Sequence, residues 1–437
     1  MTFGSRPRRA IVPRAAVAAS VVLAAAACSG GDEATPVSTT STTAATTTTA
    51  DPANPTADGV LRIGVLVPRT GGQAALGPAL AAAGQLAVDD VNEAGGVLGR
   101  PVEVVFGDAG DASTDTAGAS VDTFAGGKVD VIVGPPSSGV TTLVLDKVAR
   151  SSAALVSPGN PLADPPADVP YFQLAPDLDL LGAAVGDQAA ERGLPTALIV
   201  ARDDAFGQRV ADAVAQRLTA RGVTPTIQPY NPESEAYGGD VAAALAAGPA
   251  QIVLIGYAEL ADFIGGFIEQ GVLPSAFPMT VVTDRLDQAL FRRFAQPGVL
   301  NGLVAVGVGS ERAALDGELA GRLAAEDPAA TSVTFAAEVY DAVVVSALAT
   351  ARAGSDAPRA LRAEVGAVTG GEGGEACEAV EACLEAAGRG PVDWQGYGGP
   401  YRLDVSGVPE EAGFVAVTMG ADNTFAAATL RAFRAER

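Results

Sequence analysis

Short runs of β-type residues alternate with longer helix-type segments from residue 60 onward. A first series of apolar, β-branched runs occupies 62–68, 101–109, 129–135 and 154–159, and a second occupies 196–203, 224–230, 251–257, 279–284 and 302–309. Runs of this length, separated by helical periodicity, indicate βαβ units whose parallel strands are covered by helices on both faces. The two series predict an α/β fold with two doubly wound parallel-sheet lobes, and further helices are expected near 333–352 and 356–366.

The proline-rich segment 160–178 lies between the two series, and we expect the chain to cross there from one lobe to the other. In open parallel sheets, ligands bind beyond the carboxyl ends of the strands. The loops that follow the strands are therefore the expected location of a binding site. Two lobes also suggest hinge closure, in which a ligand contacts both lobes and favours the closed form.

The residue counts exclude several classes of function. The 437 residues include no histidine, so histidine-based catalysis and histidine metal sites are impossible. Three cysteines cannot complete a four-thiolate site, and no metal or cofactor is expected. The net charge of −23 repels phosphate backbones, which argues against nucleic acid as a partner.

An enzyme is not expected either. No G-x-S-x-G nucleophile elbow and no G-x-x-x-x-G-K-[ST] phosphate loop occurs in the chain. A serine nucleophile would need a base other than histidine, and neither lysine is obviously placed for that task. Opposed carboxylates of the kind that cleave glycans cannot be identified from sequence alone. A binding protein remains the favoured class.

The N-terminal residues have the pattern of an export signal. Four arginines within the first 14 residues precede the apolar stretch 15–27, which is too short for a stable membrane span. Small residues directly before Cys28 resemble a bacterial lipobox, which predicts a signal peptide over 1–27 and lipidation of Cys28. An ordinary secretory signal with an incidental cysteine is the alternative. The Thr-rich remainder of 28–59 is expected to be a disordered tether, so the protein should be anchored to the outer face of the cell membrane.

Several segments of the body resemble the periplasmic Leu/Ile/Val-binding family, the type I substrate-binding proteins of ABC importers. The family pattern of strand, Gly-rich loop, helix and second strand is matched by 62–111, with Asn92, Gly95, Gly96, Gly99 and Asp108 at motif positions. Further similar segments are 129–141, 203–214, 251–264 and 399–419. The resemblance implies a monomer that captures a small ligand and delivers it to ABC permease subunits.

The resemblance also implies lobes joined by a hinge that the chain crosses several times. Lobe 1 is expected to comprise 60–177 plus about 308–395. Lobe 2 is expected to comprise 178–307 plus about 396–437.

The loops of lobe 1 offer polar groups for a ligand carboxylate. Ser137 and Ser138 open a helix after a strand, where hydroxyl and free N–H groups suit an anion, although N-capping of the helix is the competing interpretation. Gly159 and Asn160 follow the fourth strand, where they can form either a ligand contact or a simple turn. Pro161 stands where family members often have threonine, which puts an ordinary α-amino acid ligand in question.

Lobe 2 is expected to add aromatic and acidic groups. Tyr257 follows a buried strand and either contacts the ligand or lies half-exposed at the strand end. Asp284 either pairs with a ligand ammonium group or caps a helix over 286–294. Leu76 of lobe 1 and Phe206 of lobe 2 are expected as apolar walls, with core packing as the alternative. Phe206 replaces a tyrosine that is common in the family, which makes the pocket less polar.

Cys377 and Cys383 are expected to form a disulfide, because pairs of cysteines in exported proteins are commonly bonded. Side chains six residues apart in a helix point to different sides, so the bond requires a break in helicity between them. Two free thiols are the alternative.

These observations predict an extracytoplasmic solute-binding lipoprotein whose ligand is a branched-chain or other apolar amino acid. Pro161 and Phe206 motivate an amide, urea or hydrophobic acid as the second ligand class. A stand-alone sensor lipoprotein with the same fold is the alternative function.

Overall fold

A computed structural model describes residues 57–159, 162, 169–232, 234, 236–257, 259–285, 288–291, 293–309, 317–404, 406–426 and 431–436. The predicted signal peptide, Cys28, nearly all of the predicted tether and Asn160 lie outside the described residues. Among the helices that are described, none combines the length and apolar character needed to cross a membrane.

The first sheet is wholly parallel, with strand order β2-β1-β3-β4-β5. Its strands are β1 (Arg62–Val67), β2 (Glu103–Asp108), β3 (Val131–Val133), β4 (Ala154–Ser157) and β5 (Tyr171–Gln173). Helices α1 (Gly77–Glu93), α2 (Thr116–Gly126) and α3 (Ser138–Ser151) connect the first four of these strands. The five residues of β1 after Arg62 are buried, as expected for a central strand that is covered on both faces.

The second sheet combines parallel and antiparallel strands in the order β13-β14-β10-β9-β8-β6-β7, with β15 paired to β14. Its parallel strands are β6 (Thr196–Arg202), β7 (Thr224–Tyr230), β8 (Ile252–Ile255), β9 (Met279–Arg285) and β10 (Val304–Val308). Its antiparallel strands are β13 (Tyr401–Leu403), β14 (Pro409–Thr418) and β15 (Arg431–Glu436). The fold is therefore α/β with two strand–helix series, as predicted, but the C-terminal residues add antiparallel strands that the periodicity did not indicate.

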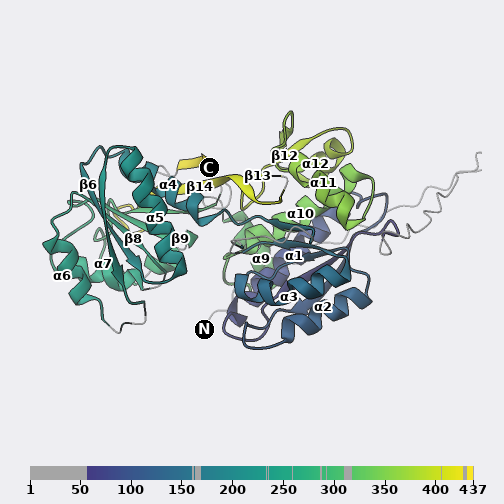
Figure 1. Ribbon diagram of the computed structural model, residues 1–437, viewed down its shortest axis with the longest axis horizontal. Helices are drawn as coiled ribbons and strands as arrows, with labels where there is room; N and C mark the ends of the chain where they lie inside the picture. The colour runs from purple at the N-terminus through teal and green to yellow at the C-terminus, as the bar shows by residue number, and fades with distance from the viewer. Residues whose placement is uncertain are drawn as a thin grey trace, which may run out of the picture. The chain divides into compact units, whose positions relative to one another are not determined.

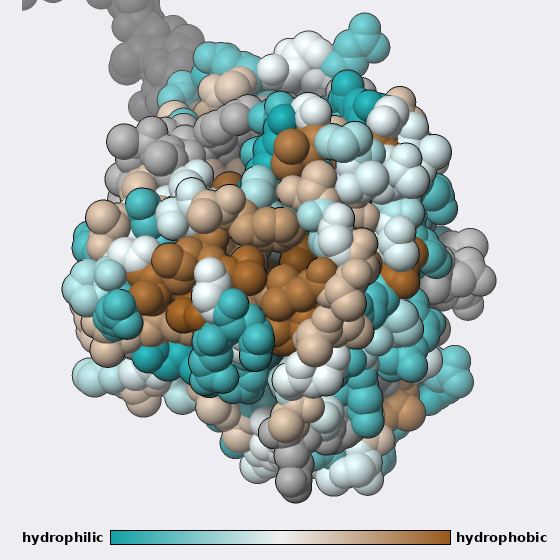
Figure 2. All heavy atoms as spheres, turned by 90° about the vertical axis from the view of Figure 1, so that its left-hand side faces the viewer, coloured by the Kyte–Doolittle hydropathy of each residue, from teal (hydrophilic) through white to brown (hydrophobic). Residues whose placement is uncertain are grey.

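Helices α4 (Leu178–Ala190), α5 (Ala205–Ala220), α6 (Gly238–Ala246) and α7 (Leu260–Glu269) belong to the second series, and Figure 1 shows α5, α6 and α7 along its strands. The hydrophobic core to which α6 and α7 contribute has partly buried apolar residues packed against it, including Leu245, Ile268 and Phe277. Figure 2 shows the side of the molecule on which α6 and α7 lie in Figure 1, and apolar residues gather on that side.

The predicted crossing 160–178 is shorter in the structure than the sequence suggested. Tyr171, Phe172 and Gln173 form the buried edge strand β5, which pairs in parallel with β4. Helix α4 begins at Leu178 and is capped by the Asp177 carboxylate, which accepts a hydrogen bond from the Asp179 N–H at 3.1 Å. Only residues 174–177, which include Pro176, separate β5 from α4.

Residues after the second series return to the first sheet. Helices α9 (Glu318–Glu326), α10 (Ala336–Ala353), α11 (Pro358–Val368) and α12 (Val380–Ala387) contribute to the same hydrophobic cluster as β1 and α1. Every residue of α10 from Ala336 to Thr350 is buried. A helix that is apolar on most sides is an interior helix, and α10 packs against α1, α11 and α12.

A disulfide joins Cys377 and Cys383, whose Cα atoms lie 5.7 Å apart. Cys377 ends the short strand β11 (Glu375–Cys377), which pairs with β12 (Val392–Trp394), and α12 begins only at Val380. The break in helicity that the six-residue spacing requires is therefore present.

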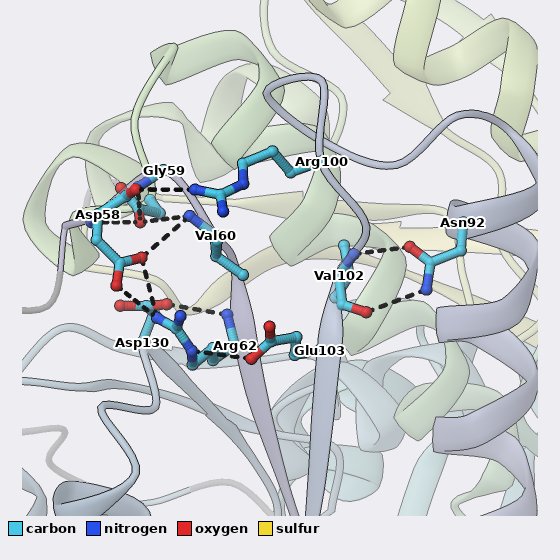
Figure 3. Close-up of polar contacts among 10 residues, drawn as sticks. Asp58, Gly59, Val60, Arg62, Asn92, Arg100, Val102, Glu103 and Asp130 are labelled. Atoms are coloured by element: carbon cyan, nitrogen blue, oxygen red, sulfur yellow. Dashed lines mark hydrogen bonds and ion pairs between the residues drawn. The ribbon is translucent and has the colours of Figure 1, made fainter. Parts of the chain in front are cut away.

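Asn92 and the turn that follows it connect α1 to β2 at the amino ends of the strands of the first sheet. The Asn92 side chain accepts a hydrogen bond from the Val102 N–H at 2.7 Å and donates one to the Val102 carbonyl at 3.0 Å (Figure 3). This exchange ties the end of α1 to the start of β2. Gly96 is required in the intervening turn, because its φ is +74° and a Cβ atom there would lie 2.2 Å from the Arg100 carbonyl. The motif is structural and lies at the end of the strands opposite to the expected site.

Candidate functional site

Asp108 organises the loop that follows β1 at the carboxyl end of the first sheet. Its Oδ1 accepts hydrogen bonds from the backbone N–H groups of Arg69 at 2.9 Å, Thr70 at 3.2 Å and Gly110 at 2.8 Å, and its Oδ2 accepts one from the Thr70 hydroxyl at 2.7 Å. Partial burial acts to raise the pKa of Asp108, but these hydrogen bonds outweigh it and lower the pKa. An ionised carboxylate therefore holds the β1 loop in place.

Ser137 and Ser138 lie at the N-terminus of α3, directly after β3. Ser137 is the N-cap residue, yet its side chain makes no capping hydrogen bond. Both residues are partly exposed. The capping interpretation is therefore not supported for Ser137, and a ligand role of the two hydroxyls stays a prediction.

The loop with Gly159 packs against the loop that carries the two serines. A Cβ atom at Gly159 would lie 1.9 Å from the Pro136 carbonyl, so only glycine allows this approach. Leu76 ends a 3-10 turn (Ala74–Leu76) after β1 and is partly buried against the core of the first lobe. The structure thus places Ser137, Ser138, Gly159 and Leu76 in segments that follow the carboxyl ends of strands of the first sheet, and Leu76 combines core packing with an exposed part.

Phe206 and Tyr257, predicted from separate segments, are in contact in the structure. Phe206 lies in the first turn of α5, and Tyr257 follows β8, the neighbour of β6 in the sheet. Their rings stack with centroids 4.8 Å apart and planes inclined by 22°. Both residues are partly exposed, so the pair forms an aromatic surface at the carboxyl end of the second sheet.

A cluster of three charged residues, Arg202, Asp204 and Glu259, lies beside this pair. Arg202 ends β6, and its guanidinium carbon lies 4.5 Å from the centre of the Tyr257 ring. Arg202 Nη1 donates to Glu259 Oε1 at 2.7 Å, and Arg202 Nε donates to Asp204 Oδ2 at 2.5 Å. Burial acts to lower the pKa of Arg202, but the hydrogen bond and the charges of its two acidic partners raise it.

The one feature of the sequence that could have identified Arg202 and Glu259 is their position near the ends of predicted strands. Arg202 is the next-to-last residue of the predicted strand 196–203, and Glu259 lies two residues after Tyr257. The pairing itself depends on β6 and β8 being neighbours in the sheet, which is a tertiary property.

Asp284 lies in β9, one residue before the strand ends. Its side chain is outside the described part of the chain, so its predicted role is not tested. Of the predicted helix 286–294, the described residues contain only a 3-10 turn (Gln288–Phe291).

The arrangement suits binding of a small solute. Hydroxyl and helix N-terminal N–H groups on the first sheet can receive a carboxylate, and the aromatic pair on the second can receive an apolar group. No group of His, Cys, Asp and Glu side chains within the described residues is arranged to hold a metal ion.

Known proteins are similar to this chain in sequence and in fold. A family model described as periplasmic binding protein matches residues 60–393. The Leu/Ile/Val-binding protein BraC3 of Rhizobium johnstonii is 30% identical over 190 residues, which are 40% of this chain and 48% of BraC3. The matched region thus spans about half the length of that relative. The chemotactic signal transduction system substrate-binding protein BasB of Halobacterium salinarum is 29% identical over 338 residues, or 71% of this chain and 75% of BasB.

Solved structures share the fold at lower sequence identity. A branched-chain amino acid ABC transporter periplasmic ligand-binding protein from Burkholderia xenovorans has a TM-score of 0.68 at 17% identity, over 86% of this chain and 95% of that chain. The substrate-binding protein LivJ from Streptococcus pneumoniae, solved with isoleucine, has a TM-score of 0.62 at 17% identity, over 86% of this chain and 99% of that chain.

Proposed function

Because this chain belongs to the periplasmic binding protein family, we propose that it captures a branched-chain or other apolar amino acid between its two lobes for delivery to an ABC permease. The observation that carries the proposal is the stacked pair of Phe206 and Tyr257 at the carboxyl end of the second sheet. An aromatic surface at that place suits an apolar side chain of a ligand.

The amino-acid backbone of the ligand is assigned to polar groups. The hydroxyls of Ser137 and Ser138, with the N–H groups at the start of α3, would receive the α-carboxylate. Gly159, and Asn160 beside it, would contribute backbone or amide groups, and Asp284 would pair with the ammonium group. Leu76 would complete the apolar wall. The names of BraC3 and LivJ, which refer to leucine, isoleucine, valine or branched-chain amino acids, support this ligand class.

The lobe boundaries and the cell location are part of the same proposal. Lobe 1 would comprise 60–177 and about 308–395, and lobe 2 would comprise 178–307 and about 396–437. A signal peptide over 1–27 and lipidation of Cys28 would anchor a monomeric protein to the outer face of the membrane, with the Thr-rich segment as its tether. Mass spectrometry of the protein purified from the membrane fraction tests this, since a Cys28→Ala variant should lose both the lipid mass and the membrane association.

Ligand identity is tested by thermal unfolding in the presence of a panel. Leucine, isoleucine and valine should raise the Tm, because a ligand at about 100 times its Kd adds about 2.7 kcal/mol to the free energy of unfolding. Glycine, urea, short amides and short carboxylates serve as the comparison set. If amides or carboxylates raise the Tm and the amino acids do not, the ligand belongs to the second class, an amide, urea or hydrophobic acid. Phe206 and Pro161 motivate that class.

A sensor role is the second candidate function, favoured by the match to BasB, a chemotaxis substrate-binding protein, over 71% of the chain. Deletion of the gene separates the two. Loss of ligand uptake supports import, whereas unchanged uptake combined with a lost behavioural or transcriptional response to the ligand supports sensing.

A further inference from the structure

Arg202 occupies a central place behind the aromatic pair. It ends β6, the strand between β7 and β8, and its side chain is only 15% exposed. Its guanidinium contacts three groups at once, namely the Asp204 carboxylate, the Glu259 carboxylate and the face of the Tyr257 ring. A planar guanidinium with several donors is suited to such a fixed arrangement, whereas a lysine ammonium is a flexible point charge.

Glu259 connects this arginine to the backbone of Tyr257. Its Oε1 accepts hydrogen bonds from Arg202 at 2.7 Å, from the Tyr230 hydroxyl at 2.8 Å and from the Tyr257 N–H at 3.2 Å. The Ile255 carbonyl, at the end of β8, lies 3.1 Å from the same Tyr230 hydroxyl oxygen and shares its single proton with Glu259. Gly256 makes room for the cluster, because a Cβ atom there would lie 2.2 Å from the Tyr230 hydroxyl oxygen.

Asp204 connects the arginine to Phe206. Its Oδ1 accepts a hydrogen bond from the Gly207 N–H at 2.9 Å and so caps α5, while its Oδ2 holds Arg202. Phe206 lies between Asp204 and Gly207 in this first turn. The Arg202 guanidinium is therefore hydrogen-bonded both to Asp204, which caps the start of α5, and to Glu259, which holds the turn after β8.

We infer that Arg202 is the positioning residue of the aromatic surface, holding Phe206 and Tyr257 stacked for an apolar ligand without touching that ligand itself. The inference rests on the proposed function and assigns the ligand selectivity of the second lobe to a residue behind its surface. Both carboxylates that face the arginine are engaged by it, so what this cluster presents to a ligand is the aromatic pair. Pre-organised contact surfaces bind more tightly because less conformational freedom is lost on binding.

The first test needs no ligand. Tyrosine rings are labelled with ¹³C, and the signal of Tyr257 among the seven tyrosines is assigned by its loss in Tyr257→Phe. In Arg202→Met the Tyr257 signal should shift or broaden, while the signals of tyrosines outside the cluster stay in place and report an intact fold. Arg209→Met is the matched control and should leave the Tyr257 signal unchanged. Arg209 also lies on α5, but it pairs with Asp177 and Asp179 at the start of α4. An unmoved Tyr257 signal in Arg202→Met overturns the inference.

The second test uses leucine, isoleucine and valine as probes in titration calorimetry. Arg202→Met should weaken binding about tenfold, Arg202→Lys should weaken it less, and Arg209→Met should have no effect. In a Tyr257→Ala background, Arg202→Met should cause a clearly smaller further loss, because there the arginine acts only through Asp204 and Phe206. Equal losses in both backgrounds would show that Arg202 acts independently and would overturn the inference. Failure of the wild-type protein to bind any probe contradicts the proposed function, while the ligand-free signal of Tyr257 still decides the role of Arg202.

Discussion

The buried carboxylate of Asp341 accepts a hydrogen bond from the Tyr401 hydroxyl at 2.7 Å, and this bond joins the interior helix α10 to the start of β13. The same carboxylate accepts hydrogen bonds from the Gly398 N–H at 2.7 Å, the Tyr397 N–H at 3.1 Å and the Trp394 indole at 3.2 Å. Asp341 therefore holds most of the segment that leads from β12 to β13.

Asp341 should make the stability of the protein depend on pH in an identifiable window. Complete burial raises its pKa from 3.8 to about 6, although its hydrogen bonds act in the opposite direction. The folded state thus binds the Asp341 proton more tightly than the unfolded state does. The stability that this protonation contributes is therefore fully present below about pH 4, and it is lost as the pH rises through 6. The stability of wild type relative to Asp341→Asn should therefore rise by on the order of 2–3 kcal/mol between pH 7 and pH 4. Urea unfolding of both proteins across this range measures the difference, and a constant difference would contradict the assignment.

Asp356 should hold residues 58–60, just before β1, in place. Its Oδ2 accepts hydrogen bonds from the backbone N–H groups of Asp58 at 3.0 Å, Gly59 at 2.8 Å and Val60 at 3.1 Å. Asp356→Ala removes this acceptor from the Asp58 and Gly59 N–H groups and leaves the Val60 N–H with only Asp58 Oδ1 at 3.2 Å, so it should lower the free energy of unfolding by about 2–4 kcal/mol. Asp356→Asn keeps one acceptor oxygen and should lose less. Glu385→Ala, which removes a highly exposed ion pair with Arg389, should change the free energy by less than about 0.5 kcal/mol, and an equal effect of the two alanine variants in denaturant unfolding would refute the role.

Ser138 should distinguish a carboxylate from an amide ligand. If its hydroxyl binds the α-carboxylate, Ser138→Ala should weaken leucine binding about tenfold, because hydrogen bonds to charged groups contribute about 1.5–3 kcal/mol. The affinity for leucinamide should change much less. Ser151→Ala, at the other end of α3, is the control for general effects on that helix. Equal losses for leucine and leucinamide would place the carboxylate elsewhere.

Asp284 should pair with the ligand ammonium group. Asp284→Asn should then weaken leucine binding about tenfold or more, while an analogue without the amino group, 4-methylpentanoate, should bind the variant no worse than it binds wild type. Calorimetric titration of both compounds makes the comparison. Unchanged affinity for leucine would refute the pairing.

The alternation of strands and helices was predictable because β1, β6 and β8 are buried on both faces and so have nearly continuous apolar sequences. β5 escaped prediction because it is three residues long and follows a proline-rich segment. The antiparallel pairing of β13 and β15 with β14 depends on contacts that no local pattern encodes.

The candidate site shows the same limit. Phe206 and Tyr257 could be named singly, because each lies just after a predicted strand. Their stacking, and the bond of Arg202 to Glu259, depend on β6 and β8 being neighbours, and sequence spacing does not specify which strands are adjacent. The structure argues against the capping interpretation for Ser137, whose side chain makes no capping bond, whereas the ligand role of Ser137 and Ser138 stays a prediction.

The central claim is that this protein binds an apolar amino acid, and calorimetric titration of the purified protein with leucine, isoleucine and valine tests it most directly. The protein is first freed of co-purified ligand by reversible unfolding. Saturable binding of at least one of the three at one site per chain, lost in Phe206→Ala, is the expected result. No binding of any of them at concentrations up to about 1 mM, where a bound ligand would gain only about 4 kcal/mol, would contradict the claim.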